Sequence, residues 1–190
     1  MLDQSKNPRR KLTKKIPDED IRILDVCVGT ANSAIAVAKE NPNTHITGID
    51  LSKDMIAVAE RKVKKQKISN ISFQHMDATK MVFSDNCFDV VMVSFGLHEL
   101  GYDLMIKILH EINRILKKGG KLYIIDYEKE NDSFKKILLW LCLKLFEPKH
   151  MSEFLEYNWD DILREAGFSL DSNEKQLFSK LISGIKIKTI

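Results

Sequence analysis

The chain has 190 residues, of which 44% are hydrophobic, and 30 basic against 27 acidic residues give a formal net charge of +3. This composition fits one globular domain, and the charge is too balanced to indicate a nucleic-acid partner. No signal peptide opens the chain, no apolar run reaches membrane-spanning length, and the three cysteines have neither disulfide-framework nor zinc-ligand spacing, so we expect a cytoplasmic protein without a metal site.

The elements expected in chain order alternate between strand and helix. Residues 1–19 form a basic lead-in, which we interpret as a solvated, partly disordered tail rather than an arm for an anionic partner. Residues 20–190 are predicted to form a single domain. Strands are expected near 21–28, 44–50, 71–76, 88–94, 121–127, 168–177 and 180–190, and helices near 31–40, 53–67, 102–117, 134–146 and 158–166. This alternation predicts an α/β fold with a Rossmann-like, doubly wound, mostly parallel sheet of seven strands. Gly119-Gly120 and Gly167 are expected to close the helices that precede them.

Residues 21–50 are the most informative stretch. An apolar run ends at a turn that contains Gly29, a helical run follows, and a second apolar run ends on Asp50. This is the pattern of a βαβ unit, in which both strand tips lie at the ligand-binding edge of the sheet. Because a carboxylate at that tip can accept hydrogen bonds from both hydroxyls of a ribose, we predict a cofactor that contains a nucleoside.

The missing glycines narrow the cofactor class. A dinucleotide fingerprint has glycines at three positions that allow close approach to a pyrophosphate, and these positions here are Cys27, Gly29 and Asn32. The chain also lacks a phosphate-binding G-x-x-x-x-G-K-[ST] loop. These departures disfavour an NAD-dependent reductase and favour a cofactor with a ribose and no phosphate.

Five segments carry a resemblance to a known family. Asp25-x-Cys27-x-Gly29-x-Ala31 resembles the first motif of class I S-adenosylmethionine-dependent methyltransferases, an acid followed by alternate glycines. Four more segments between residues 20 and 128 resemble later motifs in the same order: Asp50-Leu51-Ser52-x-x-Met55, Met76-Asp77-Ala78, Phe83-x-x-Asn86-Cys87-Phe88-Asp89 and Arg114-Ile115-Leu116-Lys117-x-Gly119-Gly120-x-Leu122. The resemblance implies S-adenosylmethionine as the cofactor and an antiparallel last strand, which the final pair of strands would supply.

The same resemblance implies a set of cofactor-binding residues. They are Asp25, Cys27, Gly29, Thr30, Asp50, Leu51, Met55, Asp77, Ala78, Ser94 and Phe95. Two interpretations of Asp25 stay open, because it either receives a hydrogen bond from the amino group of the cofactor or braces the Gly29 loop. Cys27 is expected to lie buried against the methionine portion of the cofactor and not to act as a nucleophile.

One segment is similar to a narrower group. Ser94-Phe95-Gly96-Leu97 resembles the ubiquinone and menaquinone C-methyltransferases, which continue with an Arg-Asn pair that is implicated in positioning the quinone. This chain continues instead with His98-Glu99. The departure leaves the cofactor unchanged but argues against a quinone acceptor.

His98 is the first candidate for a catalytic residue, and Glu99 is a weaker one. An imidazole just past the fourth strand suits a general base or a substrate anchor, because it titrates near neutral pH. The alternative is a surface histidine that caps the helix beginning near Tyr102. Asp126-Tyr127, at the end of the fifth strand, is expected to border the substrate.

The apolar segment 134–146 has several interpretations. A helix that is apolar nearly all round is buried on more than one side. We favour a lid or a substrate wall within residues 129–157, and a dimer surface or contact with a membrane surface are the alternatives. The sequence does not determine the oligomeric state.

The motifs together predict methyl transfer from S-adenosylmethionine to a small, apolar acceptor molecule. Two alternatives are a C-methyltransferase of a quinone pathway and a non-catalytic cofactor-binding subunit that serves a partner. An open cavity beside Phe95 and His98 would favour an enzyme, and a filled one would favour the subunit.

Overall fold

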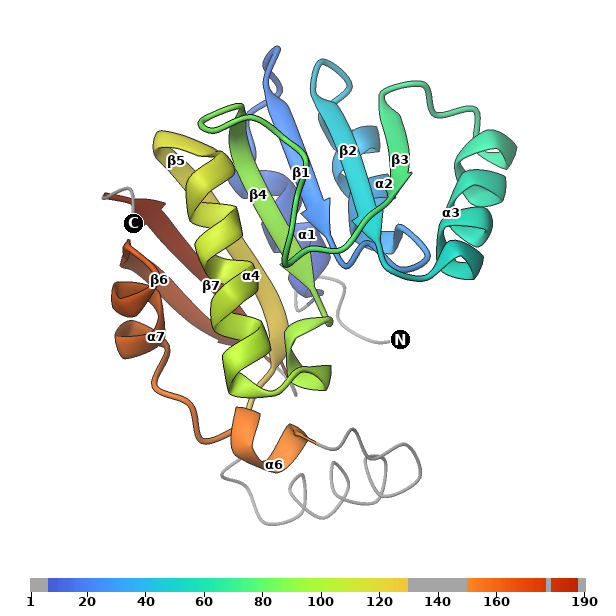
Figure 1. Cartoon of the computed structure of the whole chain (residues 1–190). Coiled ribbons are helices and arrows are strands. Elements are labelled where there is room, and N and C mark those ends of the chain that lie inside the picture. Colours follow the sequence, from blue (N-terminus) through green and yellow to red (C-terminus); the bar gives the residue numbers. More distant parts are fainter. Residues whose placement is uncertain (1–6, 130–149, 177–178, 188–190) are drawn as a thin grey trace.

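The computed structural model describes residues 7–129, 150–176 and 179–187, so the predicted helix at 134–146 lies outside the described residues (Figure 1). In chain order the elements are α1 (Pro8–Lys15), β1 (Arg22–Val26), α2 (Asn32–Glu40), β2 (His45–Asp50), α3 (Lys53–Lys65), β3 (Ile71–His75), β4 (Phe88–Ser94), the 3-10 helix η2 (Leu97–Glu99), α4 (Tyr102–Ile115), β5 (Leu116–Tyr127), α6 (Met151–Phe154), α7 (Trp159–Glu165), β6 (Phe168–Gln176) and β7 (Ser179–Lys186).

The strands form one seven-stranded sheet in the order β3-β2-β1-β4-β5-β7-β6. Neighbouring strands from β3 to β5 are parallel, whereas β7 is antiparallel to both β5 and β6. This confirms the predicted Rossmann-like fold, including the antiparallel last strand. The direction of strand addition reverses between β1 and β4, and open α/β sheets bind ligands at such a switch point.

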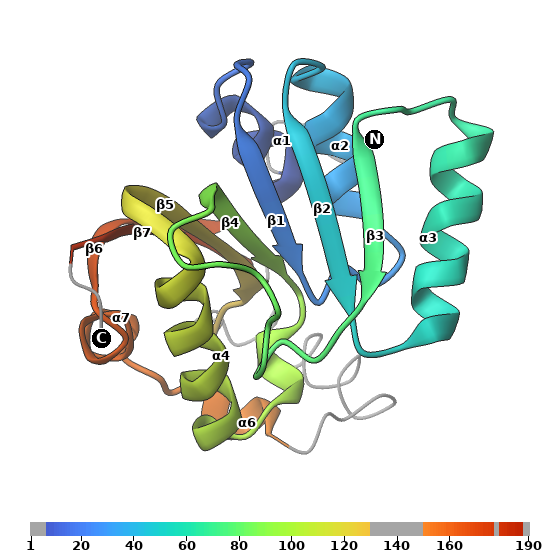
Figure 2. The same ribbon diagram turned by 45° about the horizontal axis from the view of Figure 1, so that its top comes forward.

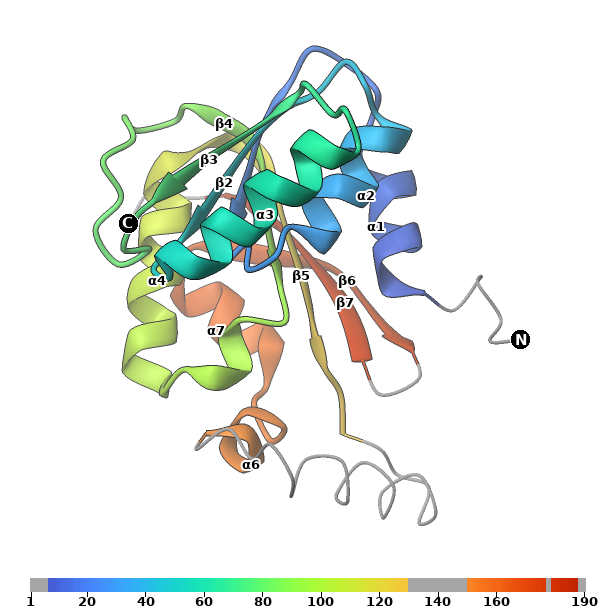
Figure 3. The same ribbon diagram turned by 90° about the vertical axis from the view of Figure 1, so that its right-hand side faces the viewer.

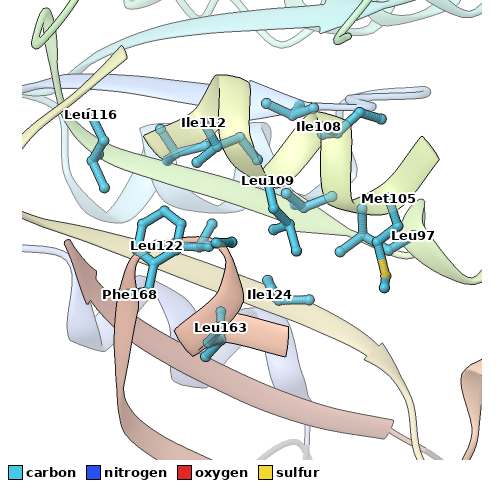
Figure 4. Packing of buried hydrophobic residues seen from close by; sticks show 14 of the residues in the cluster. Leu97, Met105, Ile108, Leu109, Ile112, Leu116, Leu122, Ile124, Leu163 and Phe168 are labelled. Atoms are coloured by element: carbon cyan, nitrogen blue, oxygen red, sulfur yellow. The ribbon is translucent and has the colours of Figure 1, made fainter. Parts of the chain in front are cut away.

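Helices cover both faces of the sheet (Figure 3). Helices α1, α2 and α3 pack through one apolar cluster on one face, and α4, α6 and α7 pack through a second cluster on the other. Figure 4 shows part of the second cluster, where side chains of α4 and α7 meet β5 and β6. The central strand β1 is buried on both faces, with Ile23, Leu24 and Val26 fully buried, which explains its uninterrupted apolar run. None of the helices within the described ranges has both the length and the apolar character needed to cross a membrane.

The N-terminal segment corrects one prediction. Residues 8–15 are not a solvated tail but the helix α1, which Asn7 caps at its N-terminus. Leu12 and Ile16, four residues apart, are buried in the same cluster as α2. Lys11 and Lys15 both pair with Glu174 of β6. Burial of one apolar stripe stabilises the helix despite its basic composition.

The glycine pair after α4 corrects another prediction. The helix ends at Ile115, and Leu116 is already extended and pairs with Phe88 of β4. Gly119, at φ +74°, therefore lies within β5, where the pairing with β4 shifts in register, and does not close the helix. Gly167, at φ +79°, does follow the last turn of α7 as predicted, and its N–H donates to the carbonyl of Arg164.

Candidate active site

The carboxyl ends of the parallel strands meet at one edge of the sheet, where the arrowheads of β1, β2, β3 and β4 converge in Figure 2. A cavity of about 200 Å³ opens at this edge. Five of the predicted cofactor-binding residues line it together with six others: Cys27, Ile49, Asp50, Leu51, Met76, Asp77, Ala78, Thr79, Leu100, Leu104 and Ile108. The fold therefore brings three separate motifs of the sequence into one site.

The loop after β1 has an unusual backbone. Every second residue of the loop has a positive φ: 54° at Cys27, 52° at Gly29 and 61° at Ala31. Residues with a Cβ disfavour this conformation, which explains why the corresponding motif of the family carries alternate glycines. The two substitutions by Cys and Ala therefore keep the loop geometry at a conformational cost.

Asp50 is fixed by main-chain donors. Its Oδ2 accepts the N–H of Gly29 at 2.8 Å, and its Oδ1 accepts the N–H of Ser52 at 2.9 Å. Ser52 in turn caps α3 by accepting the N–H of Met55 at 3.3 Å. Each carboxylate oxygen can accept a second hydrogen bond. Asp50 is therefore held in place and still able to accept both hydroxyls of a ribose.

Asp77 and several apolar side chains line the same cavity. Asp77 is exposed, and its Oδ1 accepts both the N–H and the hydroxyl of Thr79 at 2.8 Å. These hydrogen bonds lower the pKa of Asp77. Apolar side chains that include Leu51, Leu104 and Ile108 line the cavity beside it. A carboxylate rim around apolar walls matches the flat ring and polar edge of an adenosine.

The loop residues Cys27 and Thr30 have different roles. Burial, with further contributions from Asp50 and Asp25, raises the pKa of the Cys27 thiol to about 12. The thiol is therefore neutral at physiological pH, which supports the interpretation that Cys27 is not a nucleophile. Thr30 is tied to α3, because Lys62 donates to its hydroxyl at 2.8 Å and to its carbonyl at 3.2 Å.

Asp25 is a buried acid near the end of the loop-bearing strand β1. The residue is 1% exposed, and within the described part of the chain its Oδ1 makes no hydrogen bond. Burial raises the pKa of Asp25 to about 8, against the opposing effects of the Ala34 N–H and of Arg9. A buried and unsatisfied carboxyl at the ligand edge fits the interpretation that it receives a donor from the cofactor.

A second constellation lies at the ends of β4 and β5. His98, in η2, is 5% exposed, and its Nδ1 lies 2.7 Å from Oδ1 of Asp126. Asp126 is fully buried and also accepts main-chain N–H groups, among them that of Leu97 at 3.1 Å. Glu99 is exposed, with its Oε1 4.0 Å from Nε2 of His98. Because Gly101 caps α4, His98 does not cap that helix.

Three more residues that were predicted to bind the cofactor, Met55, Ser94 and Phe95, do not line this cavity. Met55 is 44% exposed on the first turn of α3. Ser94 has a buried hydroxyl that makes no hydrogen bond within the described residues, and Phe95 packs its ring 5.3 Å from that of Tyr127. Sequence reasoning missed the apolar cavity walls from α4, Leu104 and Ile108, because their helical spacing reads as ordinary core packing.

Comparisons with known proteins agree with this geometry. Residues 23–120 match the methyltransferase domain family. The demethylmenaquinone methyltransferase of Listeria monocytogenes serotype 4b is 33% identical over 181 residues, covering 84% of this chain and 76% of that protein. The enzyme of the same name from Halalkalibacterium halodurans is 28% identical, covering 87% and 69%.

Solved structures share the fold at lower identity. A SAM-dependent methyltransferase from Aquifex aeolicus has a TM-score of 0.75 at 23% identity, covering 97% of this chain and 94% of that one. The [4+2]-cyclase SpnF has a TM-score of 0.73 at 20% identity, covering 93% and 80%. Because a cyclase shares this architecture, the fold alone does not specify the reaction.

The chain belongs to the class I S-adenosylmethionine-dependent methyltransferases, and S-adenosylmethionine is its cofactor. Within that class it belongs to the menaquinone-type family, which contains the Listeria and Halalkalibacterium enzymes. The family resemblance, the enzyme class and the cofactor predicted from the sequence are thereby confirmed.

Proposed function

We propose that this methyltransferase acts on a small, apolar acceptor that bears an ionisable hydroxyl, and that His98 is the general base. A quinol is the first acceptor to test, because relatives at about one-third identity are named demethylmenaquinone methyltransferases. The observation that carries the proposal is the buried pair of His98 and Asp126, with 2.7 Å between Nδ1 and Oδ1.

The pair defines which ring nitrogen is the base. A carboxylate only accepts hydrogen bonds, so Nδ1 of His98 donates to Asp126. The neutral ring then carries its free lone pair on Nε2. Asp126 orients the imidazole and stabilises the cation that forms when Nε2 takes a proton. Asp126 is thus a positioning residue, and His98 is the proposed catalytic residue.

The surroundings of His98 suit an apolar ring. The ring of Tyr127 lies edge-on to the imidazole with 4.8 Å between centroids, and that of Phe154 lies at 6.2 Å. Tyr127 also contacts Phe95. Aromatic walls favour flat, apolar acceptors and exclude water from the imidazole. Because Phe154 belongs to α6, we also propose that this helix forms one side of the acceptor site.

The proposed mechanism gives each group one role in the transfer. When bound, S-adenosylmethionine supplies an activated methyl group on its sulfonium. His98 removes the acceptor's proton, Asp50 and the cavity walls hold the nucleoside, and the aromatic walls align the acceptor. The acceptor gains a bond to the methyl carbon, the bond from that carbon to sulfur breaks, and the proton remains on Nε2.

A single-turnover assay with radiolabelled cofactor tests the proposal. The acceptors are demethylmenaquinol, a short-chain naphthoquinol, a catechol, a primary amine and a thiol. We expect transfer to one or more hydroxyl-bearing acceptors, and a loss of roughly 100-fold or more in His98→Ala. His45→Ala is the matched control, because His45 is exposed at the opposite edge of the sheet.

Two outcomes would contradict the proposal. Transfer only to the amine or the thiol would contradict the proposal that the acceptor bears a hydroxyl, since neither needs the same base. Transfer by His98→Ala at the wild-type rate would show that His98 is a structural residue of η2. Asp126→Asn should retain part of the rate, because the asparagine oxygen still accepts from Nδ1 but no longer stabilises the cation.

A further inference from the structure

Arg9, on the first turn of α1, is an unexplained cation near the candidate site. Its guanidinium carbon lies 5.1 Å from the centroid of the Phe95 ring, and its Nε donates to the hydroxyl of Ser33 at 3.1 Å. Among residues 7–129, 150–176 and 179–187, its two terminal amino groups make no hydrogen bond. Burial lowers the pKa of Arg9, with Asp25 opposing this effect, yet an arginine stays charged.

The cavity wall connects the nucleoside end of the site to Arg9. Cys27 lines the cavity that contains Asp50. A Cβ placed on Gly96 would lie 2.7 Å from Cβ of Cys27, so the backbone of Gly96 packs directly against that side chain. Phe95 immediately precedes Gly96, and the guanidinium of Arg9 lies over the Phe95 ring. A ligand that leaves the cavity past Cys27 therefore approaches Arg9.

A carboxyl group and a cation are available at this end of the site. Asp25 has the unsatisfied buried Oδ1, and it is close enough to Arg9 for each to shift the pKa of the other. The end of the cofactor's methionine portion carries one ammonium and one carboxylate. An arginine fork matches a carboxylate in charge and in geometry.

We propose that Arg9 binds the carboxylate of the methionine portion of the cofactor. The inference rests on the proposed placement of the ribose at Asp50, with the methionine portion extending past Cys27. It gives α1 a role in ligand recognition, because burial of Leu12 and Ile16 fixes the helix that carries Arg9. The alternative is that Arg9 only neutralises Asp25 and packs against Phe95.

Calorimetric titration with three ligands separates these roles. S-Adenosylhomocysteine has both charged groups, its decarboxylated analogue keeps only the amine, and 5′-methylthioadenosine lacks both. We expect Arg9→Gln to weaken S-adenosylhomocysteine roughly 10- to 100-fold, because charge-assisted hydrogen bonds are lost. Binding of the other two ligands should change by less than about twofold. Arg10→Gln is the matched control, since Arg10 is its exposed neighbour.

Equal weakening of all three ligands would overturn the proposal, and so would unchanged binding of S-adenosylhomocysteine. The first result would mean that Arg9 only supports the fold, which thermal unfolding of Arg9→Gln would show independently. The placement of the nucleoside is tested separately by Asp50→Ala. If that variant binds 5′-methylthioadenosine as tightly as the wild type does, the placement fails whatever Arg9→Gln shows.

Discussion

We propose that the ligand-binding edge has a cofactor half around Asp50 and an acceptor half around His98, and that the two halves use their carboxylates in different ways. In the cofactor half, Asp50 is half-buried, is held by the main chain of two loops, and keeps lone pairs for a ligand. In the acceptor half, Asp126 is fully buried and accepts from Nδ1 of His98, the residue that we propose contacts the acceptor. We propose that Asp50 binds the ligand directly, whereas Asp126 acts by orienting His98.

This difference predicts a separation between affinity and rate. Substitutions in the cofactor half should weaken binding of both S-adenosylmethionine and S-adenosylhomocysteine. Substitutions in the acceptor half should slow transfer while leaving binding of the cofactor unchanged.

The Asp50→Ala variant should lose roughly 2–4 kcal/mol of binding free energy for S-adenosylhomocysteine, because it lacks charge-assisted hydrogen bonds to two hydroxyls. That corresponds to about a 10- to 1000-fold increase in Kd, measured by calorimetry. Asp54→Ala, an exposed neighbour on α3, is the control and should bind as the wild type does. An unchanged Kd in Asp50→Ala would break the assignment of the cofactor half.

Gly96→Ala probes the contact where the two halves meet. The added Cβ would lie 2.7 Å from Cβ of Cys27 and 3.4 Å from its Sγ, so we expect a loss of roughly 1–3 kcal/mol in the free energy of unfolding. In the Cys27→Gly background both atoms are gone, and most of that loss should disappear. Urea unfolding of the four proteins gives the coupling, and strictly additive losses would show that the contact is not a constraint.

Asp25 should release a proton when the cofactor binds. Since burial holds its pKa at about 8 in the free protein, Asp25 is mostly neutral below that pH. The ammonium of the bound cofactor would lower the pKa of Asp25, an effect that Arg9 assists and Asp50 opposes. The affinity for the cofactor should therefore rise as pH rises toward 8. Titrations in two buffers of different ionisation enthalpy near pH 7 should show release of up to about one proton. Any proton release that remains in Asp25→Asn comes from groups other than Asp25. Equal proton release in both proteins would contradict the prediction.

Ala31→Gly should have the smallest effect. Glycine removes the strain of a positive φ at 61°, worth roughly 1–2 kcal/mol, but it loses a buried methyl group and gains chain entropy when unfolded. These terms nearly cancel, so we expect a free energy of unfolding within about 0.5 kcal/mol of that of the wild type. Ala34→Gly, equally buried but inside α2, should lose about 1–2 kcal/mol. Equal losses would mean that the loop after β1 stores no strain.

The cofactor half was largely predictable from the sequence because local signals define it. The apolar strands, the alternating positions of the Gly29 loop and the acid at the end of β2 lie within 30 consecutive residues that a βαβ unit brings together. Each strand and helix that was predicted within the described residues is present, with ends that differ by a few residues. The antiparallel last strand was expected only from the family resemblance.

The acceptor half was less predictable because contacts between distant residues define it. His98 was singled out, but its partner Asp126 is 28 residues away and was expected only to border the substrate. Phe154 lies on a helix of four residues, α6, which is too short to leave a periodic pattern. Arg9 was interpreted as part of a solvated tail, since two buried apolar residues, Leu12 and Ile16, were a weak signal among many basic ones.

A crystal structure of the complex with S-adenosylhomocysteine would locate both halves of the edge against one ligand. We predict that the ribose hydroxyls hydrogen-bond to Asp50, that the methionine portion passes Cys27, and that the sulfur atom faces His98. A ribose away from Asp50, or a sulfur separated from His98 by protein atoms, would contradict the division of the edge into a cofactor half and an acceptor half.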